Sequence, residues 1–274
     1  MILQSYCLPR KVVETVEIEW AWEDISDAGF HQLVNNFCNY CQENAGTDTR
    51  ATSLFATLHL WNKSTGRIQL KAVLIDAQQA DKLIGRLLHA VNKELDFSYR
   101  VERKKLGWLE FALNPFPDIF SGEKGSFKVK DAFLLEPYTP DQVRVLHHYL
   151  TMASTVPGGF IGLATYGGQV NTVAPGATAS FQRTAILTTA CVAGWINPDQ
   201  EKQHMEWVRN CYKDLFAQTG GVPVPGKQSG GCLIAHPDKD LADAGSNTSG
   251  IAWHWLYYQD NYQRLQWLKQ MGPA

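Results

Sequence analysis

The chain has 274 residues, of which 45% are hydrophobic and 11% aromatic, so it can bury a large core and is not intrinsically disordered. Its 25 basic and 27 acidic residues leave a net charge of −2, which provides no cationic field for nucleic acid. No apolar stretch approaches the length of a membrane span, and no signal peptide is visible. We therefore expect a soluble, cytoplasmic protein without nucleic-acid or membrane partners.

The first hundred residues predict alternating strands and helices. In chain order we expect a strand over 13–22, a helix from about Ser26 to about Glu43, strands over 52–61 and 68–75 that pair as a hairpin, a helix over 77–93 and a strand over 97–103. This order is the split β-α-β pattern, which places both helices on one face of an antiparallel sheet. Residues 105–130 contain prolines and glycines without a clear period and are predicted to be a long connection.

The second half of the chain continues the alternation. Thr139 and Pro140 form a helix start, with the threonine as cap and the proline at the first helical position, and Asn197-Pro198 repeats the signal. The pair Gly158-Gly159 precedes a strand and predicts a turn. Strands are expected over 160–166 and 185–195, and the longest helix ends at Gly220 and Gly221. The predicted fold is α+β, with one antiparallel sheet of about six or seven strands and helices chiefly on one face.

Two kinds of motif bear on whether the chain binds a metal or a nucleotide. Cys38 and Cys41 form a C-x-x-C, but no second pair of cysteines or histidines lies at zinc spacing. Both cysteines follow the apolar stripe of a predicted helix, which favours buried core thiols over a redox or metal pair. No glycine-rich motif of the dinucleotide or P-loop kind is present, so the sequence predicts neither a metal site nor a pyrophosphate cradle.

Five segments of the second half occur in a familiar order. They are Tyr166-Gly167-Gly168-Gln169-Val170-Asn171, Thr178-Ala179 with Gln182-Arg183, Thr219-Gly220-Gly221-Val222-Pro223-Val224-Pro225, Pro237-Asp238-Lys239-Asp240-Leu241, and Trp255-Leu256-Tyr257-Tyr258 with Asn261-Tyr262-Gln263-Arg264-Leu265-Gln266. In this order the chain resembles the berberine-bridge-enzyme-like FAD-linked oxidases, most closely the bacterial members that oxidise secondary metabolites or sugars. The resemblance covers nearly the whole chain and only the second half of such an enzyme. It implies a single substrate-binding domain over 1–274, with a berberine-like C-terminal segment at about 228–274.

The resemblance also implies the cofactor and the partners. FAD is bound in that family mostly by an N-terminal domain to which nothing here corresponds, so this chain is expected neither to bind FAD nor to oxidise a substrate alone. The implied partners are a small-molecule substrate and either a separate flavin-binding domain or a second copy of the chain, and intact relatives include exported proteins. Two alternatives stay open, namely a flavin-free cyclase, isomerase or lyase in natural-product biosynthesis, and a non-catalytic partner subunit.

Two residues become catalytic candidates through the resemblance. Tyr166 ends a predicted strand, and the glycines that follow it allow another group to approach the backbone closely. The alternative is a tyrosine that only caps a core strand. His236 stands where the family has its second active-site phenol, and an imidazole, with an ordinary pKa of about 6.5, can act as a general base near neutral pH. The alternative, slightly favoured, is sequence drift of a surface that no longer faces a flavin.

Six further residues are candidates for facing the substrate or the flavin. Arg183 lies where relatives often have a histidine-arginine pair and could bind an anion, although a structural role is favoured. The aromatic residues around position 257 could line a hydrophobic pocket or pack the last helix on the sheet. The candidates are Gly167, Gly168, Asn171, Arg183, Tyr257 and Tyr258.

Overall fold

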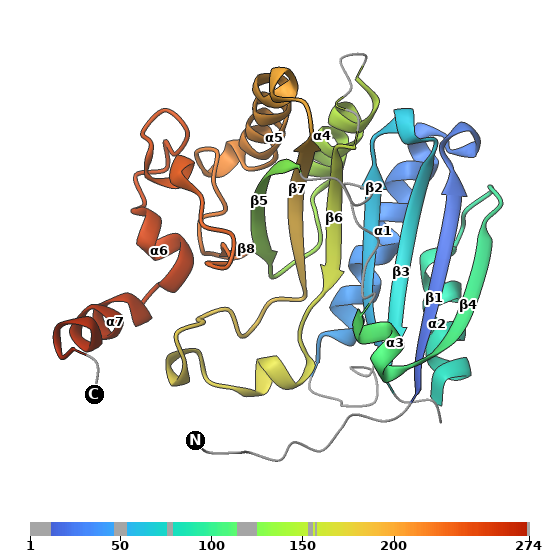
Figure 1. The fold of residues 1–274 in the computed structure, drawn as a ribbon, viewed down its shortest axis with the longest axis horizontal. Coiled ribbons are helices and arrows are strands. Elements are labelled where there is room, and N and C mark those ends of the chain that lie inside the picture. Colours follow the sequence, from blue (N-terminus) through green and yellow to red (C-terminus); the bar gives the residue numbers. More distant parts are fainter. Residues whose placement is uncertain are drawn as a thin grey trace.

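The sheet is the centre of the fold. The computed structural model describes residues 12–46, 54–75, 79–113, 125–152, 156 and 158–272. Within these ranges eight strands form one antiparallel sheet in the order β4-β1-β3-β2-β6-β7-β5-β8 (Figure 1). The strands are β1 (Val12–Ala21), β2 (Leu54–Trp61), β3 (Arg67–Leu74), β4 (Arg100–Gly107), β5 (Ser126–Leu134), β6 (Phe160–Thr165), β7 (Leu187–Trp195) and β8 (Ser229–Gly231).

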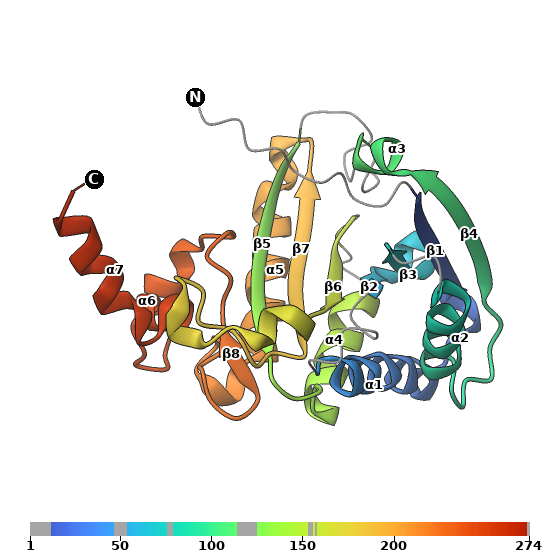
Figure 2. The same cartoon turned by 90° about the horizontal axis from the view of Figure 1, so that it is seen from below.

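Four of the longer helices pack side by side against one face of this sheet (Figure 2). Their buried residues and the inward residues of the strands form one connected hydrophobic core, in which Trp20, Phe30 and Phe37 are fully buried. The α6 and α7 helices lie beyond the β8 edge of the sheet (Figure 1). The helices are α1 (Asp27–Asn44), α2 (Ala80–Val91), α3 (Trp108–Leu113), α4 (Pro140–Thr151), α5 (Glu201–Leu215), α6 (Trp253–Tyr258) and α7 (Asn261–Gln270), and α1, α2, α4 and α5 are the four on the sheet. In the described part of the chain, none of them is long and apolar enough to cross a membrane.

The predicted helix starts are confirmed. The Ser26 side chain accepts a hydrogen bond of 3.0 Å from the backbone N–H of Gly29 and caps α1. At α4, Thr139 and Gln142 form a reciprocal capping box with Pro140 at the first helical position. Asn197 caps a short 3-10 turn that leads into α5. These caps were visible because each depends on residues close together in sequence.

The prediction of a long connection over 105–130 is wrong where the structure describes it. Those residues hold the end of β4, the short α3 helix and the first half of β5, and residues 114–124 lie outside the described ranges. The sheet therefore has eight strands, and the count of six or seven missed β5 and β8. The period of β5 was hidden because Lys128 and Lys130 occupy its inward positions, where lysines are rare. The β8 strand is a Ser-Gly-Gly tripeptide without any strand signal.

The cysteine pair and the glycine pair behave as predicted. Cys38 and Cys41 are buried in the core beneath the sheet, and burial raises the pKa of the Cys38 thiol to about 12. A thiol with such a pKa stays protonated and is a poor nucleophile. Gly158 adopts a positive φ of 76° in the turn before β6. The interpretation as core thiols and a turn is confirmed.

Candidate functional site

The face of the sheet that the helices leave uncovered carries an open depression of about 300 Å³. Successive residues of a strand point to opposite faces, so the residues between the core positions of β2, β5, β6 and β7 form its floor. Within it Gly162 pairs with Ala190 across the β6–β7 register, so two of its lining residues are small. The lining residues are Thr57, His59, Phe127, Val129, Phe160, Gly162, Ala164, Thr188, Thr189, Ala190, Val192 and His236.

His236 stands at the rim of this depression and is bonded to a buried carboxylate. Its Nδ1 lies 2.6 Å from Oδ2 of Asp131, and its side chain remains 41% exposed. The other carboxylate oxygen of Asp131 accepts a hydrogen bond of 2.7 Å from the backbone N–H of Leu233. The hydrogen bond with Asp131 raises the pKa of His236, against the opposing effect of burial. The pair has the geometry of an imidazole oriented by an acidic residue.

The segment that carries His236 is fixed by an ion network on the other face of β5. Lys128 Nζ lies 2.5 Å from Asp238, and Lys130, only 4% exposed, contacts both Asp238 and Asp240. Arg209 of α5 donates two hydrogen bonds of 2.9 Å to Asp240. The segment therefore contacts β5 on both faces, through the lysines on the helix side and through Asp131 on the open side.

Burial alone would raise the pKa of the Asp240 carboxyl. The hydrogen bond from Arg209 and the charges of Lys130 and Lys128 outweigh this effect and hold the pKa well below its usual range. Asp240 is therefore ionised throughout the physiological range, and its charge is matched by its basic neighbours.

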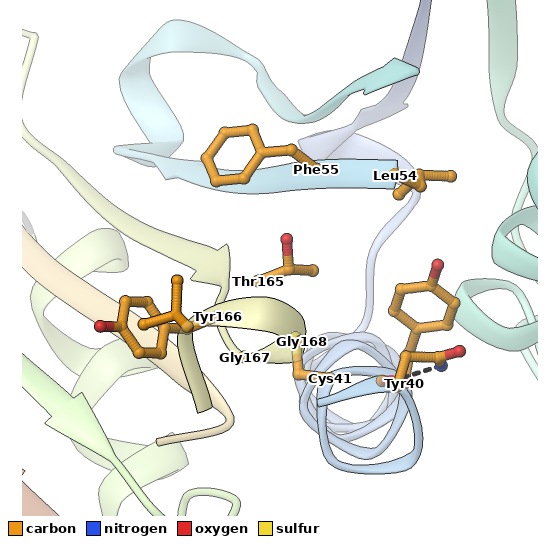
Figure 3. Close-up of a pocket in the computed structure, with 10 residues that line it drawn as sticks. Tyr40, Cys41, Leu54, Phe55, Thr165, Tyr166, Gly167 and Gly168 are labelled. Atoms are coloured by element: carbon orange, nitrogen blue, oxygen red, sulfur yellow. Dashed lines mark hydrogen bonds between the residues drawn. The ribbon is translucent and has the colours of Figure 1, made fainter. Parts of the chain in front are cut away.

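Tyr166 lies at the end of β6 and lines a second pocket, of about 240 Å³, between β2 and α1 (Figure 3). Its hydroxyl points away from Tyr40 and donates a hydrogen bond of 3.1 Å to the carbonyl of Gln182. Burial raises the pKa of the Tyr166 phenol. In this structure the Tyr166 hydroxyl is therefore hydrogen-bonded to the backbone of its own chain.

The two glycines after Tyr166 do allow a close approach, and the group that approaches is the backbone of α1's end. Gly167 has a φ of 125°, and a Cβ there would lie 2.5 Å from the carbonyl oxygen of Ala45. The N–H of Gly168 donates to that same oxygen at 3.1 Å. From the sequence, these glycines are explained by a ligand that lies against the backbone. The contact with Ala45 explains Gly167 as well, since any side chain at position 167 would displace Ala45.

Tyr166 and His236 are on the same face of the sheet but do not meet. Tyr166 packs edge-on against Phe133, with ring centroids 5.1 Å apart, while His236 is bonded to Asp131. Asp131 and Phe133 are alternate residues of β5 and share its open face. The structure thus places the two candidates near neighbouring positions of one strand and in separate pockets.

Asn171 and Arg183 hold the loop that follows β6. The Asn171 amide donates to the carbonyl of Ala185 at 3.1 Å, and the Arg183 guanidinium donates to the carbonyl of Val170 at 3.4 Å and to the Thr178 hydroxyl at 2.5 Å. These contacts lie within the loop itself. Arg183 thus has partners within its own loop, and its role in binding an anion stays a prediction.

Tyr257 supports the His236 segment from α6. Its hydroxyl accepts a hydrogen bond of 2.9 Å from the backbone N–H of Asp238, and its ring is buried. Tyr258 instead stacks on Tyr262 of α7, which also stacks on His254 at 4.0 Å. The aromatic cluster therefore packs α6 against α7. Leu256 and Tyr257 also belong to the hydrophobic core, and α6 lies against β8 at the edge of the sheet, so packing remains one of the two alternatives for this cluster.

Sequence reasoning missed two residues of the open face. Asp131 was missed because it falls just after the supposed connection and its partner is 105 residues away. His59 lies on the floor of the depression, and burial, with a smaller contribution from Lys71, lowers its pKa to about 4. The signal for His59 was available, since it occupies the polar phase of an alternating strand.

The same architecture occurs in solved flavoenzymes. A flavoenzyme involved in caerulomycin biosynthesis has a TM-score of 0.89 and 34% identity, over 96% of this chain and 53% of its own. A glycopeptide hexose oxidase, solved with teicoplanin, has a TM-score of 0.87 and 34% identity, over 95% of this chain and 52% of its own. A berberine-bridge-like protein of the moss Physcomitrella patens, at 14% identity and a TM-score of 0.69, shares the fold alone. These matches define the class of protein: the chain corresponds to about half of a flavin-dependent oxidase.

The curated relatives give the same result. The aclacinomycin oxidase of Streptomyces galilaeus is 34% identical over 270 residues, which are 97% of this chain and 49% of the relative. The hexose oxidase of Chondrus crispus is 28% identical over 158 residues, which are 53% of this chain and 29% of the relative. No family model matches the chain. The chain belongs to the berberine-bridge-enzyme-like FAD-linked oxidases. It spans about half the length of the aclacinomycin oxidase, and its match to the hexose oxidase covers 29% of that protein.

Proposed function

We propose that residues 1–274 are the substrate-binding domain of an FAD-linked oxidase that acts on a secondary metabolite or a sugar-like substrate, with 228–274 as its berberine-like segment. The observation that carries this proposal is the depression on the open face of the sheet, which is lined by small residues such as Gly162, Ala164 and Ala190 and by His236. The described helices cover the opposite face, so this face of the sheet is open to a planar ring. A separate flavin-binding domain is the partner that we propose to cover it.

The residues of the open face fit one side of a flavin ring. Gly162, Ala164 and Ala190 would lie against the ring or the substrate, because their small side chains leave room for a flat group. When bound, FAD accepts a hydride from a carbon that carries oxygen or nitrogen. His236 would take the proton that is released from the substrate, and the apolar floor would exclude water from the reacting atoms.

We expect the chain alone to be redox-inactive, because the described residues supply at most one wall for the ring and the sequence has no glycine-rich motif for a pyrophosphate. A single wall leaves much of the cofactor in water and does little to offset the cost of immobilising it. The purified protein should be colourless, and added FAD should bind no more tightly than roughly high micromolar. A visible absorbance spectrum followed by a fluorescence titration measures both. A yellow protein with stoichiometric flavin would refute redox inactivity.

A flavin-free cyclase, isomerase or lyase is the second candidate, and the His236–Asp131 pair favours it. An oriented imidazole can move a proton without any redox cofactor. The discriminating result would be a colourless chain that transforms a substrate by itself and loses this activity in His236→Phe. The third candidate is a non-catalytic partner subunit. It predicts that the chain binds a flavin-containing protein and that His236→Phe leaves the oxidation rate of that complex unchanged.

A further inference from the structure

We propose that Cys191 and Cys211 are a latent disulfide pair, which joins α5 to β7 when the chain meets an oxidant of the disulfide class. The oxidant is a small-molecule disulfide such as oxidised glutathione. This inference does not rest on the proposed function, because both thiols belong to the hydrophobic core between the helices and the sheet. The cross-link adds a covalent tie on the face of the sheet that α5 covers.

The two sulfur atoms are already in contact. Sγ of Cys191 lies 3.6 Å from Sγ of Cys211, and both side chains are at most 1% exposed. Cys191 comes from β7 and Cys211 from α5, which packs directly on that strand. A disulfide bond is about 2.05 Å long, so the sulfurs need to approach each other by about 1.5 Å. A change of one χ1 rotamer moves a sulfur atom farther than this, so the approach does not require the strand to leave its pairing.

The other described cysteines have different surroundings. Cys38 and Cys41 lie on successive turns of the same helix, α1, and the sulfur of Cys232 lies 3.4 Å from a tyrosine hydroxyl. All of them are buried, so burial alone does not single out the proposed pair. The distinguishing feature of Cys191 and Cys211 is a direct sulfur–sulfur contact between two different elements of the fold.

Burial makes the pair slow to react while the chain is folded. It raises the pKa of the Cys211 thiol well above its usual value, and the hydrogen bond with Cys191 acts in the same direction. The thiolate is the attacking species in disulfide exchange, so little of it forms near neutral pH. The oxidant reaches the thiols when α5 lifts from the sheet, and the finished disulfide is shielded from reductants by the same burial. The redox state of the pair is therefore set when the chain folds or opens.

The reaction consumes one molecule of the small disulfide. The thiolate of one cysteine attacks a sulfur of the oxidant, whose S–S bond breaks and releases a thiolate that takes up the proton of that cysteine. The second cysteine then attacks the mixed disulfide, so that the Cys191–Cys211 bond forms and a second small thiol leaves with the second proton. Two cysteine thiols are oxidised, and one disulfide is reduced to two thiols.

The cross-link joins two elements that border the ion network. Cys191 pairs with Lys130 across the β5–β7 register, and Arg209, on the same helix as Cys211, binds Asp240. The disulfide closes a loop between cysteines 20 positions apart, which restricts the unfolded chain and so stabilises the fold. We expect Tm to rise by roughly 5–10 °C on oxidation.

The test is peptide mapping of the purified chain after equilibration with oxidised glutathione, a few degrees below Tm so that α5 opens often. Free thiols are alkylated, and the chain is cut with trypsin. Cys191 then lies in the fragment 184–202 and Cys211 in the fragment 210–213, while Cys38 lies in the fragment 12–50. We expect one cross-linked mass that joins the first two fragments and that reduction splits, with Cys38 alkylated.

Cys191→Ala is the test variant, and Cys38→Ala, at another buried core cysteine, is the matched control. Both variants lose a buried sulfur, but only Cys191→Ala should abolish the rise in Tm on oxidation. The peptide map of the wild type decides the question if either variant unfolds. Free Cys191 and Cys211 after equilibration, or glutathione attached to either of them without the cross-link, would overturn the proposal.

Discussion

In an assembly that contains this chain and a bound flavin, His236→Phe is expected to lower kcat/KM by about 10²–10⁴-fold, the usual contribution of a general base. Phenylalanine keeps the planar ring at the rim of the depression and removes the nitrogen that would accept the proton. His236 is partly exposed and contributes little to the core, so the variant should fold. Steady-state rates of substrate oxidation measure the effect.

His89→Phe is the matched control, because His89 is exposed on α2, on the opposite side of the sheet. It should leave kcat/KM unchanged. The dependence of kcat/KM on pH adds a second check. The raised pKa of His236 means that the acceptor form is lost as the pH falls through that pKa, so kcat/KM should fall on the acid side. An activity of His236→Phe within a few-fold of the wild type would show that another group accepts the proton.

Lys130→Ala is expected to lower the free energy of unfolding by about 3 kcal/mol, because it removes one partner of a buried ion network. Lys130 also lies over the ring of Tyr212, 4.9 Å from its centroid, and this contact is lost as well. We expect the lower end of the usual range, since Lys128 and Arg209 still pair the two aspartates. Urea unfolding at neutral pH measures the change.

The pH dependence of that difference has a definite sign. The pKa of Asp240 is lower in the folded chain than in the unfolded one, where it is about 3.9. Its ionisation therefore stabilises the fold above about pH 4, and this contribution is lost as the pH falls through the folded pKa. The effect of Lys130→Ala should shrink in acid. Lys202→Ala, at an exposed position of α5, is the control and should stay within about 0.5 kcal/mol of the wild type. Equal losses for both variants would contradict the network.

The elements that were predicted well have short-range causes. Ser26 and Thr139 cap helices through bonds to residues three positions away, and the apolar stripe of α1 identified Cys38 and Cys41 as core residues. The elements that were missed depend on distant partners. Lys130 reads as a solvent-facing residue until Asp238 and Asp240 are brought next to it, more than a hundred residues later in the chain.

The site residues divide in the same way, into those that the sequence could indicate and those that depend on distant partners. His236 was found because a resemblance in sequence pointed to its position, while Asp131, its partner, belongs to a strand that no local period revealed. The glycines after Tyr166 correctly predicted a close approach to the backbone, but only the fold shows that Ala45 makes this approach. Residue types indicate what a position tolerates, and the tertiary structure determines which group meets it.

The central claim is that the open face of the sheet is the surface that meets flavin and substrate. Its most direct test is a titration of the isotope-labelled chain with FAD, followed through the amide and imidazole signals. We predict weak binding that perturbs residues of the depression, such as Phe160, Ala190 and His236, and leaves α5 unperturbed. Perturbations centred on α5 and the other helices, with an unaffected depression, would contradict the claim.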